Sequence, residues 1–109
     1  MATTYKILGQ SKPSATTTTN LYTVPSDTNT VISTITVCNL DSSTATYRIS
    51  CVPSGDTLSD ENYIVFGANV PANDTIALTL GLTLNSSGSV NVYASTASIA
   101  FGAFGSEIV

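Results

Sequence analysis

The stretch Val31-Ile-Ser-Thr-Ile-Thr-Val-Cys-Asn39 decides the fold class. Its apolar residues alternate with threonine and serine, a period of two that is typical of a β-strand with one buried face. The two faces of this expected strand are Val31, Ile35 and Val37 on one side and Ile32, Thr34, Thr36 and Cys38 on the other. The pattern predicts a strand over residues 31–39.

Shorter stretches of the same kind recur on both sides of this segment. They cover residues 5–9, 20–24, 46–52, 62–66, 75–80 with a continuation to Leu84, 90–94 and 98–104. Gly81 interrupts the alternation and predicts a bulge or bend. No stretch of ten or more residues shows a helical period with caps. We therefore expect an all-β fold, an antiparallel two-sheet sandwich of about eight strands that is Ig-like or jelly-roll-like.

The chain of 109 residues has the length of one domain, and no part of it differs in composition from the rest. We expect residues 1–109 to form a single β-sandwich domain. The polar segment over residues 10–20 has no apolar period, so it predicts a loop or an arm. If the segment is an arm, residues 1–20 extend from the domain and pair with the exposed strand edge of a neighbouring protein molecule.

Two cysteines and one arginine occur in the expected strands around residues 31–52. Cys38 and Cys51 are thirteen residues apart, on consecutive strands that predict a hairpin. This spacing permits a cross-strand disulfide, but we expect reduced thiols packed as small apolar residues. Arg48 alternates with Tyr47 and Ile49, so it is expected to point to solvent or to a partner.

Charge is scarce along the whole chain. The sequence has three Lys and Arg, seven Asp and Glu and no His, which gives a formal net charge of −4. Three scattered cations cannot neutralise several phosphates, so we expect no nucleic-acid binding and no adhesion to an anionic membrane. No apolar run approaches the roughly 20 residues that cross a bilayer. The first residues do not resemble a secretory signal, which predicts synthesis in a cytoplasm.

Catalytic motifs are also missing. Without histidine the chain cannot form a Ser-His-Asp or Cys-His arrangement, and the two cysteines lack further ligands for a metal. The adjacent acids Asp60 and Glu61 lie in the polar segment over residues 53–61, whose spacing does not match a calcium loop, and we expect a solvated loop. The sequence thus predicts no enzyme, no catalytic, cofactor-binding or metal-binding residues, and no cofactor.

The ordered elements of the chain are Tyr5-Lys-Ile-Leu-Gly-Gln10, Leu21-Tyr-Thr-Val-Pro25, Val31-Ile-Ser-Thr34 with Val37-Cys-Asn39, Tyr47-Arg-Ile-Ser50, Asn62-Tyr-Ile-Val65, Val70-Pro-Ala-Asn-Asp-Thr75 and Phe104-Gly-Ser-Glu-Ile108. In these segments the chain resembles small virion structural proteins of tailed bacteriophages, especially cyanophages. These segments span nearly the whole chain. The resemblance implies a β-sandwich building block of heads or tails, without catalysis or cofactor.

Three functions follow as expectations. The first is a capsid decoration or cement protein that stabilises the head shell, binds the major capsid protein in the virion and forms a homo-oligomer such as a trimer. The second is a tail, neck or baseplate subunit. The third is a host- or carbohydrate-binding module, which the aromatic residues disfavour, because such a face usually exposes its rings. The five tyrosines instead fall in expected strands: Tyr5, Tyr22, Tyr47, Tyr63 and Tyr93.

Overall fold

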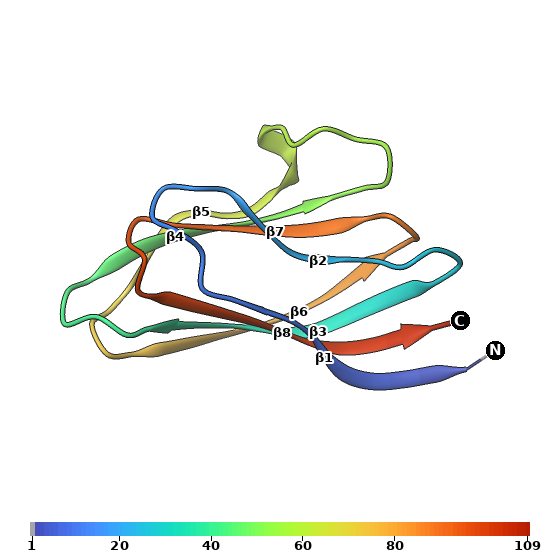
Figure 1. The fold of residues 1–109 in the computed structure, drawn as a ribbon, viewed down its shortest axis with the longest axis horizontal. Helices are drawn as coiled ribbons and strands as arrows, with labels where there is room; N and C mark the ends of the chain where they lie inside the picture. Colours follow the sequence, from blue (N-terminus) through green and yellow to red (C-terminus); the bar gives the residue numbers. More distant parts are fainter. Residues whose placement is uncertain (1) are drawn as a thin grey trace.

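Within residues 2–109, which the computed structural model describes, eight strands lie in two facing antiparallel sheets (Figure 1). Sheet A contains, in spatial order, β1 (Thr3–Ser11), β8 (Ile99–Ile108), β3 (Asn29–Asn39) and β6 (Thr75–Leu84). Sheet B contains β2 (Thr19–Thr23), β7 (Ser89–Ala94), β4 (Ala45–Val52) and β5 (Tyr63–Val70). The predicted antiparallel two-sheet sandwich is confirmed. No helix in this part of the chain has the length and apolarity needed to cross a membrane.

The strand order is that of a jelly roll. Strand β1 pairs with β8, β2 with β7, β3 with β6 and β4 with β5, so the chain forms one long antiparallel hairpin rolled into two sheets. The loop between β4 and β5 stays on sheet B and contains a short 3-10 turn, η1 (Asp60–Asn62). The other connections cross between the sheets. An Ig-like order, with sheets built from consecutive strands, does not fit this pairing.

The core lies between the sheets and is almost entirely aliphatic. Its fully buried members include Ile32, Ile35 and Val37 of β3, Ile49 of β4, Val90 and Val92 of β7, and Ile99 of β8. The rings of Tyr47 and Phe101 meet edge to face across the sheets, with their centroids 6.4 Å apart. Burial of these side chains at about 25 cal/mol per Å² is the main source of stability.

The core face of β3 differs from the prediction at two neighbouring residues, Val31 and Ile32. Ile32 is fully buried and Val31 only half-buried, whereas Val31 was expected to share the face of Ile35 and Val37. A register shift at Ser33 causes the difference, because one extra residue reverses the faces on one side of it. The alternation in the sequence carries no sign of this bulge.

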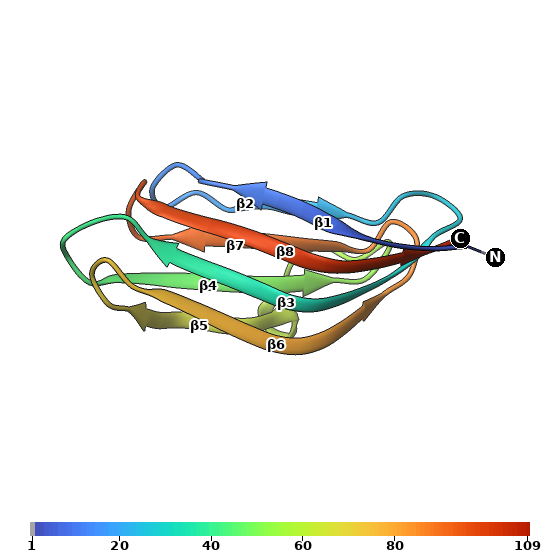
Figure 2. The ribbon, with the colours of Figure 1, turned by 90° about the horizontal axis from the view of Figure 1, so that it is seen from below.

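Register shifts form a band across sheet A. They lie at Leu8 in β1, at Ser33 in β3 and at Leu80 and Gly81 in β6. Gly81 has a φ of +62°, a left-handed conformation that glycine adopts easily, and the predicted bulge there is confirmed. Figure 2 shows β8, β3 and β6 curving together. The band explains this shared bend, since bulges increase local twist and curvature.

The N-terminal segment is a strand of the sandwich for most of its length. Residues 3–11 pair with β8, which continues to Ile108, beyond the predicted strand end at residue 104. Residues 12–18 then cross to sheet B, where Pro13 is buried and the N–H of Thr16 donates to the carbonyl of Ala94. The expected arm over residues 1–20 is therefore corrected, because β8 supplies the backbone partners that an arm would lack. Met1 lies outside the described residues.

The predicted hairpin that carries both cysteines is wrong. Cys38 lies in β3 of sheet A and Cys51 in β4 of sheet B, because the chain crosses between the sheets over residues 40–44. Both thiols are free and half-buried. Cys51 packs against the core, as expected, whereas Cys38 alternates with the buried Val37 and Asn39 and lies on the outer face of sheet A.

Asn39 fixes the end of β3 against the turn that joins β5 to β6. Its side chain is buried, and its amide donates to the carbonyls of Ser43, Val70 and Pro71 at 2.8, 3.1 and 3.2 Å. Its side-chain oxygen accepts a hydrogen bond from the N–H of Asp41. These bonds satisfy a buried polar group that would otherwise be costly. They also set the position at which β6 begins.

Gly9 allows β1 and β2 to touch, and its replacement tests this contact. A Cβ atom on Gly9 would overlap the backbone carbonyl of Leu21. We expect Gly9→Ala to lower the free energy of unfolding by about 3 kcal/mol, because one backbone must shift. Gly55→Ala is the control, since Gly55 has open space around it and a φ of +84°. It should cost about 1–2 kcal/mol from backbone strain alone. Equal losses in chemical denaturation would contradict the close contact.

Candidate interaction surface

The loop between β4 and β5 places its acids at the start of η1, not in a binding site. Asp60 and Glu61 occupy the first turn, and Ser59 and Asn62 form a reciprocal capping arrangement around it. Hydrogen bonds from the backbone N–H of Glu61 and from the Ser59 hydroxyl lower the pKa of the Glu61 carboxyl. Within residues 2–109 no group of three or more His, Cys, Asp or Glu side chains is placed to hold a metal ion.

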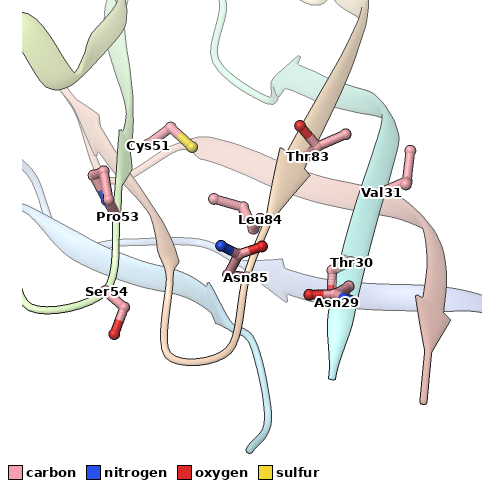
Figure 3. A pocket seen from close by; sticks show the side chains of 9 residues that line it. All are labelled: Asn29, Thr30, Val31, Cys51, Pro53, Ser54, Thr83, Leu84 and Asn85. Atoms are coloured by element: carbon pink, nitrogen blue, oxygen red, sulfur yellow. The ribbon is translucent and has the colours of Figure 1, made fainter. Parts of the chain in front are cut away.

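A pocket opens at one end of the sandwich, between the start of β3, the end of β4 and the end of β6 (Figure 3). Its volume is about 530 Å³. Its lining is uncharged: Asn29, Thr30, Val31, Cys51, Pro53, Ser54, Thr83, Leu84 and Asn85. Burial raises the pKa of the Cys51 thiol, which keeps it protonated and a weak nucleophile.

Arg48 is the centre of the most distinctive surface feature. It projects from the outer face of sheet B and lies between the rings of Phe66 and Tyr93, with its guanidinium carbon 4.1 Å from each ring centroid. The strand register explains the stack, because Tyr93 of β7 and Phe66 of β5 are the direct neighbours of Arg48 in β4. In the part of the chain that the structure describes, the Arg48 guanidinium has no ion pair. Its hydrogen-bond donors therefore remain available.

Further aromatic and polar side chains continue this face. Tyr63 meets Phe66 edge to face, with ring centroids 4.9 Å apart, and Asp60 lies beside them in a shallow hollow. The next row across the sheet contains Asn20 and Asn91, with the buried Ser50 beside Asn91. We name the surface formed by Arg48, Tyr63, Phe66 and Tyr93 the arginine patch. Phe66 is 62% exposed, so the patch is open to a partner.

Only part of the arginine patch was predictable from the sequence. Arg48 was expected to point to solvent or to a partner, and it does lie on the outer face, but the tyrosines do not avoid exposure as expected. Tyr22 and Tyr47 are buried, whereas Tyr5 is 84% exposed and Tyr63 and Tyr93 are half-exposed. The sequence did indicate that the Tyr93 ring points outward, because Tyr93 alternates with the apolar Val90 and Val92. No sequence pattern indicated the same for Phe66, because the register shift at Ile64 decides which face of the sheet carries the Phe66 ring.

The side of the sandwich between β5 and β6 leaves part of the core uncovered. Half-buried aliphatic side chains line it, namely Ile64, Val65 and Ala68 of β5 and Ile76, Leu78 and Leu82 of β6. We call this strip the open side. From Asn62 to Leu84, which includes both strands, Asp74 is the only charged residue in the sequence. An apolar, uncharged strip beside an arginine and three rings has the composition of a protein interface core.

A polar network joins the sheets at the opposite side. Among residues 2–109 the one ion pair links Lys6 Nζ and Glu107 Oε1, 3.0 Å apart. The Tyr22 hydroxyl donates to Glu107 Oε2 at 2.5 Å and lies 2.8 Å from the Thr30 hydroxyl. Burial and the Glu107 carboxylate raise the pKa of Tyr22 to about 12. The hydrogen bonds from Tyr22 and Lys6 lower the pKa of Glu107. The network ties β1, β3 and β8 to β2.

No protein-family model matches the chain, and no curated protein sequence matches it.

The network makes stability sensitive to acid. The pKa of Glu107 is lower in the folded protein than in the unfolded chain. The ionised carboxylate therefore adds to the free energy of unfolding above the unfolded-state pKa, near 4.3. This stabilisation is lost as the pH falls through the folded-state pKa. The raised pKa of Tyr22 affects the pH dependence of stability only above about pH 10.

We expect Tyr22→Phe to lower the free energy of unfolding by about 1.5–3 kcal/mol at pH 7, since it removes a hydrogen bond to a charged group. The cost should shrink at pH 3. An equal loss at both pH values in urea unfolding would contradict this role.

Proposed function

We propose that this chain is a non-enzymatic virion structural protein of a tailed phage, and that it decorates or cements the head shell. The resemblance of its strand and turn segments to such proteins supports the proposal. Its jelly-roll strand order is also widespread among viral capsid domains, although one fold serves many functions. The observation that carries the proposal is the nature of the described surface, which offers contact area in the arginine patch and along the open side.

The arginine patch suits the contact with a shell protein. Arginine and large aromatic residues dominate binding hot spots, because they combine a wide apolar area with directional hydrogen bonds. The stack between Phe66 and Tyr93 holds the guanidinium flat, which presets it for a bidentate contact with a carboxylate. The proposed partner is the major capsid protein. Repetition over a symmetric shell converts a small contact into firm attachment.

The proposed location is the finished virion, after synthesis in the cytoplasm of the bacterial host and assembly as a homo-oligomer. A tail, neck or baseplate subunit is the alternative within the same class. Copy number separates these locations. A quantitative protein gel of purified particles should give on the order of hundreds of copies for a shell component and at most a few tens for a tail or neck component. Absence from the particles would overturn the proposal.

Arg48→Lys tests the contact that the arginine patch provides. Lysine keeps the charge but loses the planar fork, so binding of the chain to undecorated particles should weaken by about tenfold or more per site. The matched control is Lys12→Arg, which changes an exposed cation in the loop after β1 and should leave binding unchanged. Circular dichroism checks that both variants fold. Unaltered binding by Arg48→Lys would exclude the patch as the contact.

The outward rings favour one second candidate, a glycan-binding module. Tyr63, Phe66 and Tyr93 expose aromatic area beside amide and hydroxyl side chains, and jelly rolls also serve as lectin domains. Binding of the isolated chain to a glycan array, with loss of that binding in Phe66→Ala, would favour this candidate over the shell protein.

A further inference from the structure

Three of the four edge strands carry features that hinder pairing with another chain. Strand β1 has the exposed cation Lys6 and a register shift at Leu8. Strand β2 has only five residues and a shift at Leu21. Strand β5 is interrupted at Ile64 and at Gly67, whose φ is +74°. Charge, short length and bulges are the usual protections of sheet edges.

Strand β6 lacks these protections over its first half. Residues 75–79 pair with β3 without a register shift, and they contain neither a charge nor a proline. Asp74 precedes this segment, and the bulge at Leu80 and Gly81 follows it. Thr75, Ala77 and Thr79 are exposed on the outer face, whereas Ile76 and Leu78 are half-buried on the core face. A regular apolar edge of this kind is a template for another strand.

We propose that β6 pairs with β6 of a second copy of this chain, antiparallel and about a two-fold axis at Ala77. The proposal deepens the homo-oligomer part of the proposed function and rests on it. An antiparallel pair about a two-fold axis is isologous, so both copies use the same residues. The resulting assembly is a dimer, in place of the trimer that the sequence led us to expect.

The register follows from the positions of Asp74 and Gly81. A shift by one residue is excluded, because it would set the core face of one copy opposite the outer face of the other. Centring the pair on Ile76 would extend the ladder to Asp74, which precedes β6, and centring it on Leu78 would carry the ladder across the bulge at Gly81. Centring on Ala77 uses only the regular residues 75–79.

This pairing covers the open side. It places Ile76 opposite Leu78 of the second copy on the core face and Thr75 opposite Thr79 on the outer face, and both are favourable cross-strand pairs. The half-buried strips of the two β5 strands then lie next to each other below the joined sheet. Asp74 falls opposite the apolar Leu80 of the second copy, so no two carboxylates face each other. Two acidic molecules can therefore meet here without local repulsion.

The oligomeric state of the purified full chain tests the proposal. Sedimentation equilibrium from about 1 µM to about 1 mM should show a reversible dimer. Ala77→Lys should raise its dissociation constant by about tenfold or more, because the two new lysines would face each other across the axis. Thr3→Lys adds the same charge to the exposed start of β1 and should leave the constant unchanged. Thermal unfolding checks that both variants fold.

A cysteine at position 77 tests the register itself. Ala77→Cys should form an intermolecular disulfide under mild oxidation, because its Cα atoms would be within the distance that a disulfide spans. Thr83→Cys, beyond the bulge on the same strand, should not. A monomer over the whole range, a trimer, or a dimer that Ala77→Cys does not cross-link would overturn the proposal. A dimer that is absent from virions would contradict only the virion role, so the two failures are distinguishable.

Discussion

The absence of a side chain at Gly9 lets β1 lie against the backbone of Leu21 in β2, and this close approach closes the sandwich along one side. The network of Tyr22, Lys6 and Glu107 reinforces the same side. The side between β5 and β6 has no equivalent, because these strands approach each other less closely than β1 and β2 do. Because the sandwich is closed at the β1–β2 side and open at the β5–β6 side, an uncharged part of the core is within reach of another molecule. The proposed functions depend on this accessible part of the core.

The period of two predicted the existence and position of the strands, because each strand buries one face independently of its partners. It also predicted the bulge at Gly81, where glycine marks the conformation. It failed at Ser33, whose bulge has no sign in the sequence, and at the supposed hairpin of Cys38 and Cys51, since strand pairing in a rolled sandwich joins residues far apart in the chain. The arginine patch was only half predictable for the same reason.

A chain with so few charges gains little from electrostatic steering or from buried ion pairs. Its free energy comes from aliphatic burial and backbone ladders, and the same two terms are what it offers to a partner. Arg48 is the exception, since stacking between two rings fixes a cation on an otherwise neutral sheet face. The proposed shell role would use this combination: a mostly buried core, one directional contact and one edge strand that is free to pair with a neighbour.

Amide hydrogen exchange at low and high protein concentration measures most directly whether the open side is a contact surface. The exchange of backbone amides in residues 63–84, which include β5 and β6, should slow as concentration rises, because association shields them from water. Amides in residues 3–23, which include β1 and β2, should exchange at the same rate throughout. Slowing confined to residues 3–23, or no change anywhere up to about 1 mM, would contradict the account.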